Sequence, residues 1–288
     1  MADFPAPRPP SGSVAVDGAK LSYVVEGHGR PCLVVGSSAY YRRTFSQPLK
    51  DVLRCAFLDH RGFLPNATTG TQEQYTLDMV TDDVEQVRRA LSWDRVVVYG
   101  HSIHGLIALE YARRHPEHVS HVVMEGSSPF MSEEFATVRE EHWTATASEE
   151  RKALMEERLQ GLEERLRALA PRDALVAHYV AFGPRLWADP RFDSAPLWEG
   201  VAVNSALTDQ LFAMFAGYDA AKRQPPVAAP IFAVNGWYDY QAPFTTWQQR
   251  AGQLGDLTCV LFEQSGHTPH FEEPERFAHD LARWLQQH

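Results

Sequence analysis

The residues best suited to catalysis lie in the segment Gly100-His101-Ser102-Ile103-His104-Gly105. This segment directly follows an apolar run that ends at Tyr99 and directly precedes residues with helical spacing. A serine in such a strand-to-helix turn has a strained backbone, which exposes its hydroxyl above the sheet and faces it toward the N-terminus of the next helix. The pattern therefore predicts a nucleophilic serine at position 102.

A serine hydroxyl is a weak nucleophile at neutral pH, so it needs a histidine base, and the base needs a carboxylate to hold its tautomer. Asp239 and His267 each follow a late apolar run. Because the carboxyl ends of parallel strands share one edge of a sheet, Ser102, Asp239 and His267 are expected to meet there. Glu125, which ends the apolar run after the serine turn, is the alternative acid.

The segments that would position these residues alternate between strand-like and helix-like patterns. An Asp17-Gly18 turn between two runs of β-type residues predicts a hairpin over 14–25. Runs that are apolar throughout are typical of parallel strands covered on both faces. Such strands are expected at 31–35, 54–58, 95–99, 121–124, 230–234 and 258–262, and helices at 75–91, 103–115 and 274–287. The alternation predicts an α/β fold with a mainly parallel sheet.

The pattern changes between residues 132 and 225. Segments rich in Glu and Arg with leucines at helical spacing, such as 156–169, predict amphipathic helices, and no convincing strand pattern is found there. We therefore expect a core formed by residues 1–131 and 226–288, with residues 132–225 inserted as a helical cap. Residues 1–10 are expected to form a frayed, Pro-rich arm.

Composition and charge exclude several classes of function. Of the 288 residues, 44% are hydrophobic and 22% are charged, as in ordinary globular proteins. The formal net charge of −10, without a basic cluster, argues against nucleic-acid binding. No apolar run approaches the roughly 18 residues of a membrane span. No metal-ligand spacing, dinucleotide fingerprint or phosphate loop is found, so neither a metal nor another cofactor is expected.

The N-terminus and the cysteines bear on location. The first residues do not show a basic segment followed by an apolar one, so they do not predict a secretory signal. The cysteines, Cys32, Cys55 and Cys259, are odd in number and not closely paired, and each is expected inside a buried strand. A cytoplasmic location is therefore expected.

Jointly, these segments resemble the α/β-hydrolase superfamily over nearly the full length of the chain. The resemblance rests on the serine turn and on residues 33–38, 58–62, 236–239 with Pro243, and 265–269 with Glu272 and Pro274. It implies an eight-stranded sheet flanked by helices, with a helical cap between the two halves of the core. It also implies that Ser102 is the nucleophile, Asp239 the acid and His267 the base.

The sequence departs from the family pattern at two places. His104 replaces the second glycine of the elbow pattern G-x-S-x-G, and Gly105 is expected to take over part of its packing. The loop at Val35-Gly36 lacks the His-Gly pair common in the family. Because an oxyanion hole is built from backbone N–H groups, Ile103 and Ser37 are expected to supply it.

Further residues are assigned to the surroundings of the nucleophile. His101 and His104 are expected to point away from the substrate, and His270 is expected to be structural. Aromatic residues of the cap are expected to roof an apolar pocket, with about a third of them facing the ligand. The residues expected to line the pocket are Ser38, Tyr40, Trp237, Tyr238 and Trp187.

These roles predict a serine hydrolase that cleaves a small to medium hydrophobic carboxylic ester or lactone through an acyl-enzyme. A serine at position 102 disfavours dehalogenation and epoxide opening, which need a carboxylate there. Three alternatives stay open: a proline iminopeptidase-like aminopeptidase, a hydrolase of carbon–carbon bonds next to a ketone, and a non-hydrolytic ligand-binding protein or lyase. The expected partner is a small-molecule substrate, and the oligomeric state is left open.

Overall fold

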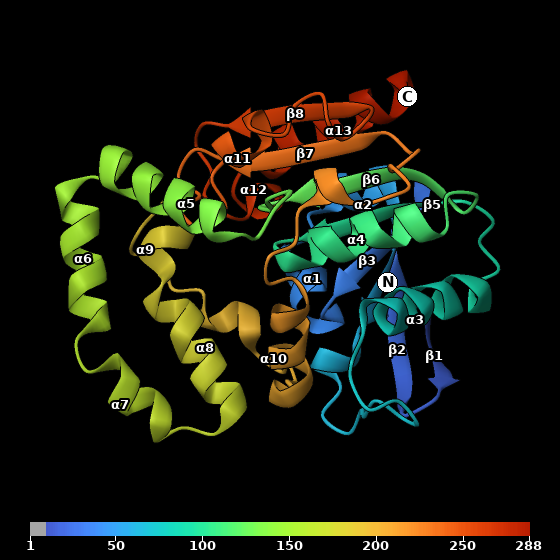
Figure 1. Cartoon of the computed structure of the whole chain (residues 1–288), viewed down its shortest axis with the longest axis horizontal. Coiled ribbons are helices and arrows are strands. Elements are labelled where there is room, and N and C mark those ends of the chain that lie inside the picture. Colours follow the sequence, from blue (N-terminus) through green and yellow to red (C-terminus); the bar gives the residue numbers. More distant parts are fainter. Residues whose placement is uncertain (1–9) are drawn as a thin grey trace, which may run out of the picture.

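The computed structural model describes residues 10–288, in which eight strands form one sheet in the order β1-β2-β4-β3-β5-β6-β7-β8. The hairpin partners β1 and β2 are antiparallel, β2 is antiparallel to β4, and the remaining neighbours are parallel (Figure 1). The strands are β1 (Ser11–Val16), β2 (Ala19–Glu26), β3 (Arg30–Gly36), β4 (Leu53–Asp59), β5 (Val96–His101), β6 (Val119–Glu125), β7 (Ile231–Gly236) and β8 (Leu257–Phe262). The expected mainly parallel α/β fold is confirmed. Residues 1–9, which include most of the expected Pro-rich arm, lie outside the described residues.

Both faces of the central strands are buried, which explains why their sequences are apolar without alternation. On β5, Val96 and Val98 belong to one hydrophobic cluster, whereas Val97 and Tyr99 belong to another on the opposite face. The neighbouring central strands divide their side chains in the same way. The sheet is therefore the middle layer of three, with a core on each side.

Helices cover the two faces and position the loops at the strand ends. The first face packs against α3, whose Thr76 side chain caps its N-terminus and whose apolar residues Val80, Val84 and Val87 follow helical spacing. The second face packs against α2 and the C-terminal α13. The core helices are α1 (Ser38–Thr44), α2 (Gln47–Val52), α3 (Leu77–Ala90), α4 (Ile103–Arg114), α11 (Thr245–Gln248), α12 (Pro269–Glu272) and α13 (Pro274–Gln287).

The chain between β6 and β7 is built from helices, in agreement with the helical pattern expected there. The α-helices of this segment are α5 (Glu133–Thr146), α6 (Glu149–Leu159), α7 (Leu162–Arg167), α8 (Pro171–Ala181), α9 (Gly183–Leu186) and α10 (Ser205–Met214). The helix expected over 156–169 is interrupted, because Gly161 has a φ of 63° and separates α6 from α7. The division into core and cap stays a prediction.

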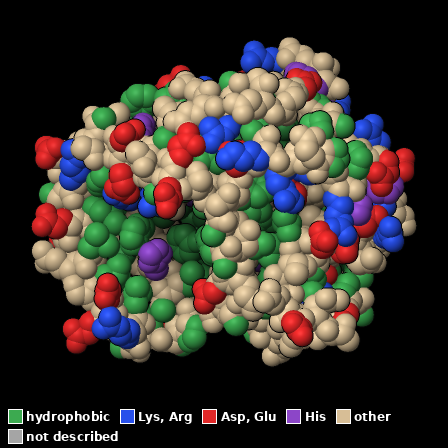
Figure 2. Space-filling view, viewed as in Figure 1, with side chains coloured by type: hydrophobic (Ala, Val, Ile, Leu, Met, Phe, Trp, Pro, Cys, Tyr) green, Lys and Arg blue, Asp and Glu red, His purple; other side chains and the backbone are tan. Residues whose placement is uncertain are grey.

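On the face shown in Figure 2, hydrophobic side chains gather in a hollow among these helices, and charged side chains lie around its rim. Within residues 10–288, no helix has both the length and the apolarity needed to cross a membrane.

The cysteines depart from expectation in two ways. Cys32 and Cys55 lie in register on the adjacent strands β3 and β4, so they are neighbours in space although they are far apart in the sequence. Cys259, on the edge strand β8, is exposed, so its expected burial was wrong. The edge position explains this, because β8 is paired on one side by β7 and lacks the second covering neighbour of a central strand.

Candidate active site

Ser102 occupies a tight turn between β5 and α4. Its φ of 58° and ψ of −133° lie in a region that non-glycine residues rarely adopt. Its backbone N–H donates to the carbonyl of Glu125 at 2.8 Å, and its own carbonyl accepts from the Ser127 hydroxyl at 2.5 Å. The neighbouring strand β6 and the residues after it therefore hold the strained conformation in place.

Glycines on either side of Ser102 allow β5 and α4 to approach closely. A Cβ atom at Gly100 would overlap the carbonyl oxygen of His104, and one at Gly105 would overlap the Ser127 hydroxyl. There is thus little room for a side chain at position 105. This agrees with the expectation that Gly105 takes over part of the packing of the elbow glycine that His104 replaces.

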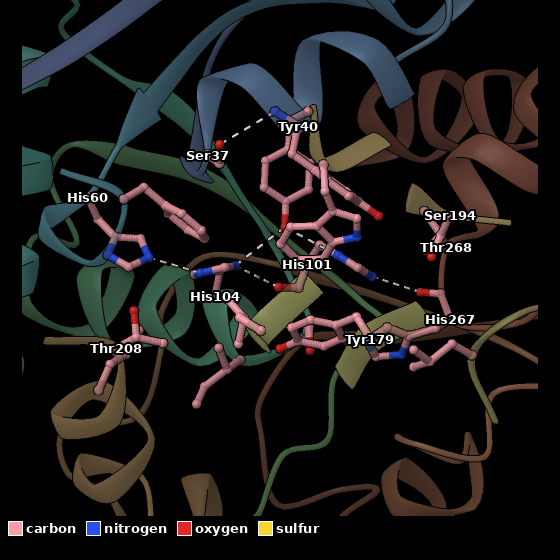
Figure 3. Close-up of a pocket in the computed structure, with 18 of the residues that line it drawn as sticks. Ser37, Tyr40, His60, His101, His104, Tyr179, Ser194, Thr208, His267 and Thr268 are labelled. Atoms are coloured by element: carbon pink, nitrogen blue, oxygen red, sulfur yellow. Dashed lines mark hydrogen bonds between the residues drawn. The ribbon is translucent and has the colours of Figure 1, made fainter. Parts of the chain in front are cut away.

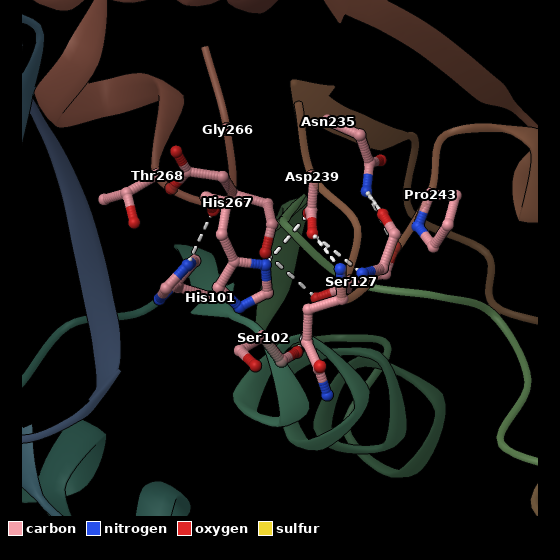
Figure 4. Close-up of polar contacts among 12 residues, drawn as sticks. His101, Ser102, Ser127, Asn235, Asp239, Pro243, Gly266, His267 and Thr268 are labelled. Carbon is pink, nitrogen blue, oxygen red and sulfur yellow. Dashed lines mark hydrogen bonds and ion pairs between the residues drawn. The ribbon is translucent and has the colours of Figure 1, made fainter. Parts of the chain in front are cut away.

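His267 and Asp239 form a buried pair at the same sheet edge. His267 Nδ1 lies 2.9 Å from Asp239 Oδ2, and the other carboxylate oxygen accepts the backbone N–H groups of Gln241 and Ala242 at 3.0 and 2.8 Å. In Figure 4 the His267 ring lies between Asp239 and Ser102, and His267 and Ser102 line the same cavity. Burial lowers the pKa of His267, but the Asp239 carboxylate raises it more, so that it lies above the ordinary value.

The main chain of His267 is held from two sides. Its N–H donates to the carbonyl of Leu186, in the helical segment, at 2.6 Å. On the other side Gly126, with a φ of 52°, approaches so closely that a Cβ atom there would lie 2.5 Å from the His267 carbonyl oxygen. His267 therefore has little freedom to move.

Glu272 supports the loop that carries His267. Its carboxylate accepts the backbone N–H groups of Ala188 at 2.8 Å, Gly266 at 2.9 Å and Thr268 at 3.2 Å. Burial raises the pKa of Glu272 to about 7, although these bonds favour the charged form. One side chain thus joins the helical segment to both residues that flank His267.

Ser37 and Ile103, the expected oxyanion residues, both border the cavity. Ser37 follows β3 and caps α1, with its hydroxyl accepting the N–H of Tyr40 at 3.4 Å. Ile103 is the first residue of α4, and the first N–H groups of a helix have no acceptor within the helix. Both residues therefore border the same cavity as Ser102, and Ile103 directly follows Ser102 in the chain.

The cavity around Ser102 is largely aromatic and aliphatic, with hydroxyl and imidazole groups between (Figure 3). None of the lining residues within the described part of the chain is Asp, Glu, Lys or Arg. The lining residues are Ser37, Tyr40, Tyr41, His60, Phe63, His101, Ser102, Ile103, His104, Leu175, Tyr179, Leu186, Trp187, Ser194, Trp198, Thr208, Leu211, Phe212, His267 and Thr268.

Some residues expected in the pocket lie elsewhere. Tyr40 and Trp187 line the cavity, but Ser38, Trp237 and Tyr238 do not. Ser38 is hydrogen-bonded to the Asp59 carboxylate, which accepts from both its N–H and its hydroxyl. The Trp237 ring stacks on Phe244, and the Tyr238 ring lies beside the Arg151 guanidinium. These neighbours hold the three side chains outside the cavity.

The expected directions of the two histidines beside Ser102 were wrong. His101 and His104 border the cavity rather than pointing away from it, and His60 borders it as well. His60 directly follows β4, so its position at a strand carboxyl end was the signal that could have placed it at this edge. Within residues 10–288, no group of His, Cys, Asp or Glu is arranged to hold a metal ion.

Comparison with known proteins agrees with this geometry. The family model of the alpha/beta hydrolase fold matches residues 28–274. The chain belongs to this family. It is 36% identical over 273 residues to the AB hydrolase superfamily protein YclE of Bacillus subtilis, a match that covers 94% of this chain and 97% of that protein.

Solved structures of the same fold include enzymes named for different activities. An esterase from Exiguobacterium antarcticum matches with a TM-score of 0.67 and 20% identity, covering 94% of this chain and 97% of the esterase. A proline iminopeptidase from Mycobacterium smegmatis matches with a TM-score of 0.69 and 18% identity, covering 96% of this chain and 98% of that enzyme. At these identities the likeness shows the fold alone.

Glu125, the alternative acid of this α/β-hydrolase, is paired with His270 instead of His267. Its Oε2 lies 2.6 Å from His270 Nδ1 and also accepts the Tyr99 hydroxyl, and its Oε1 accepts the His270 N–H at 2.8 Å. His270 Nε2 lies 2.8 Å from the Thr44 hydroxyl. Burial raises the pKa of Glu125, but His270 lowers it more, and the net shift is downward. The pair is fully buried and ties α1, β6 and α12 together.

The packing at the elbow predicts a ranking of two glycine variants. Gly100→Ala would drive a methyl group into the backbone carbonyl of His104, whereas Gly105→Ala meets the Ser127 side chain, which can shift at the cost of its hydrogen bond to the Ser102 carbonyl. We expect Gly100→Ala to lower the free energy of unfolding by about 1–3 kcal/mol and Gly105→Ala by less. Thermal unfolding of both variants tests this. Equal losses, or the reverse order, would contradict the packing described.

The two carboxylates predict opposite phenotypes. Asp239→Asn is expected to lower kcat by about 10⁴-fold with little loss of stability. The reason is that an amide would no longer hold the imidazole of His267 in the tautomer needed to accept a proton. Glu125→Gln is expected to leave kcat within about tenfold but to lower the free energy of unfolding by about 1–3 kcal/mol. Because the pKa of Glu125 lies below its ordinary 4.5, this stabilisation is present above pH 4.5 and is lost as the pH falls further. Steady-state kinetics with denaturant titrations at several pH values measure both effects.

Proposed function

We propose that the chain is a serine hydrolase that cleaves a neutral, small to medium hydrophobic carboxylic ester or lactone through an acyl-enzyme on Ser102. The observation that carries the proposal is the cavity that contains both Ser102 and His267, because its lining has no carboxylate, lysine or arginine among the described residues. Such a cavity suits an uncharged substrate, since a charged one would lose its hydration without gaining a partner.

In this mechanism, His267 takes the proton of Ser102 as the hydroxyl attacks the substrate carbonyl. The backbone N–H groups of Ile103 and Ser37 stabilise the negative oxygen that forms. His267 then protonates the leaving alcohol and afterwards activates the water that releases the acid. Asp239 holds the imidazole and stabilises its charged form throughout.

The helical segment 132–225 is proposed to act as a cap that selects the substrate. Tyr179 stacks on Trp198 with ring centroids 4.9 Å apart, and Tyr40 lies 5.0 Å from the same indole ring. With Trp187 and Phe212, these rings form much of the apolar wall above the nucleophile. They favour an aliphatic or aromatic acyl group.

A cytoplasmic location is also proposed, since the cysteines Cys32 and Cys55 are free although they are neighbours.

An aminopeptidase would need a carboxylate to pair with the free amino group of its substrate. The described cavity lining does not provide one, so the structural likeness to a proline iminopeptidase is not extended to activity. Hydrolysis of a carbon–carbon bond would use the same three residues, and it is therefore an outcome that the substrate test has to distinguish.

A fluorophosphonate probe and a substrate panel test the proposal. We expect prompt labelling of the protein and loss of labelling in Ser102→Ala, because the probe needs an activated serine. In a panel of p-nitrophenyl esters of rising acyl length, lactones, aminoacyl p-nitroanilides and a vinylogous diketone, we expect the highest kcat/KM for an ester or lactone. Absence of labelling would favour a binding protein. Faster turnover of prolyl anilide, or activity confined to a vinylogous diketone, would move the assignment to another reaction.

The pH dependence follows from His267, which must be neutral to accept a proton. Because its pKa lies above the ordinary 6.5, kcat/KM is expected to fall as the pH decreases, with a midpoint above 6.5. Glu272 is the competing explanation, because burial raises its pKa to about 7. The fall should persist in Glu272→Gln if His267 is responsible. Its disappearance in that variant would assign the titration to Glu272.

A further inference from the structure

Three histidines and one tyrosine form a continuous row of hydrogen bonds beside the nucleophile. His60 Nε2 lies 3.0 Å from His104 Nε2, and His104 Nδ1 lies 3.3 Å from the Tyr41 hydroxyl. The same hydroxyl lies 3.2 Å from His101 Nδ1, and His101 Nε2 lies 2.9 Å from the carbonyl oxygen of His267. Figure 3 shows His60, His104 and His101 following one wall of the cavity toward His267. We call His60, His104, Tyr41 and His101 the histidine chain.

The two ends of the histidine chain fix the direction of every hydrogen bond in it. At one end the Gly62 N–H, which can only donate, lies 3.0 Å from His60 Nδ1, so the proton of neutral His60 is on Nε2. His104 therefore accepts at Nε2 and carries its proton on Nδ1. That nitrogen also lies 3.2 Å from the carbonyl oxygen of His101, which can only accept, so a second contact gives the same tautomer.

At the other end the His267 carbonyl can only accept, so His101 carries its proton on Nε2. His101 Nδ1 then accepts the Tyr41 hydroxyl proton, and the Tyr41 oxygen accepts from His104. Burial lowers the pKa of His60 to about 3, and burial with the nearby His267 lowers that of His101 to about 3. Burial also lowers the pKa of His104 well below its ordinary value. With all three rings neutral, this arrangement of protons satisfies every contact.

We propose that the histidine chain is a positioning device for the general base: it fixes the one tautomer of His101 whose Nε2–H holds the backbone carbonyl of His267. The proposal rests on the role of His267 in the proposed function. The carbonyl concerned lies in the narrow space between His101 and Gly126, so a small displacement of it would turn the imidazole away from Ser102.

The neutral state of His101 has a second effect on the base. The rings of His101 and His267 have centroids 4.7 Å apart. If His101 were protonated, two like charges would face each other when His267 takes the proton of Ser102, and proton transfer would become less favourable. The Tyr41 hydroxyl prevents this by donating to the one His101 nitrogen that could take the extra proton.

This role also accounts for the histidine at the elbow position where the family has glycine. A glycine at 104 would leave His60 Nε2 and the Tyr41 hydroxyl without their shared partner, and unpartnered buried polar groups are costly. Since Gly105 provides the close packing of the elbow, position 104 is free to carry a side chain. His104 is thus the link between the cavity wall at His60 and the residues that touch the base.

Tyr41→Phe is the sharpest test, because it removes one hydroxyl and keeps the ring. Tyr111→Phe is the matched control, since Tyr111 is also a buried phenol with a hydrogen bond, to Glu85, and lies outside the cavity. We expect Tyr41→Phe to lower kcat by about 10- to 100-fold with little change in KM, and the control to retain wild-type kcat. Equal kcat values in the two variants would overturn the proposal.

The tautomers supply a readout that does not depend on catalysis. In ¹⁵N-histidine-labelled protein, two-bond ¹H–¹⁵N spectra should show Nε2–H for His60 and His101 and Nδ1–H for His104. In Tyr41→Phe the His101 signals should change to those of mixed tautomers, whereas in Tyr111→Phe they should not. An unchanged His101 pattern in Tyr41→Phe would overturn the proposal even if kcat falls. These spectra stay informative if the wild type hydrolyses no ester, so failure of the proposed function is recognised separately.

A chemical rescue covers the case in which Tyr41→Phe does not fold. His104→Gly creates a space of imidazole shape, and added imidazole can both accept from His60 and donate to Tyr41. We expect imidazole to restore at least part of the lost kcat, measured against a Ser102→Ala/His104→Gly background. N-methylimidazole fills similar space but lacks the N–H, so it should not restore activity. Equal rescue by both compounds would mean that His104 only fills volume, which would contradict the proposal.

Discussion

The site depends on one geometric constraint: parallel strands of the same sheet end at the same edge. In the described chain, Ser102, Asp239 and His267 lie far apart in sequence, yet each follows such a strand end. The strained backbone of Ser102 is held by the carbonyl of Glu125 on the adjacent strand, so Ser102 is oriented by its contact with a neighbouring strand as well as by its own turn. Loss of this register would separate all three residues at once.

Electrostatics divide the buried polar groups near this edge into two kinds. His267 is paired with the Asp239 carboxylate and His270 with that of Glu125, and the His101 ring lies 4.7 Å from the His267 ring and 6.0 Å from the His270 ring, measured between centroids. The histidine chain has no carboxylate in it, and burial lowers the pKa of each of its three histidines. The buried polar groups near this edge are thus of two kinds: histidines paired with a carboxylate, and histidines whose partners are other uncharged groups.

Much of the architecture was predictable from the sequence, because apolar runs, helical spacing and turn residues are local signals. The hairpin at Asp17-Gly18 and the serine turn at Ser102 are examples. Side-chain direction was not predictable, since it depends on neighbours from distant segments. Trp237 faces Phe244 instead of the cavity, and His104 faces it because Tyr41 and His60 provide partners. The pairing of Glu125 with His270 could not be predicted either, because the two residues are 145 positions apart in the sequence.

The contact between the helical segment and His267 links two properties that enzyme engineers usually treat separately. Leu186 and Trp187 form part of the cavity wall, and the carbonyl of Leu186 also accepts the N–H of His267. The adjacent Ala188 N–H is bound by Glu272, which supports the same loop. A library of variants that reshapes this wall to admit bulkier compounds therefore also perturbs the alignment of the His267 imidazole. Selecting such variants for a broader range of substrates at the same time selects among different turnover rates.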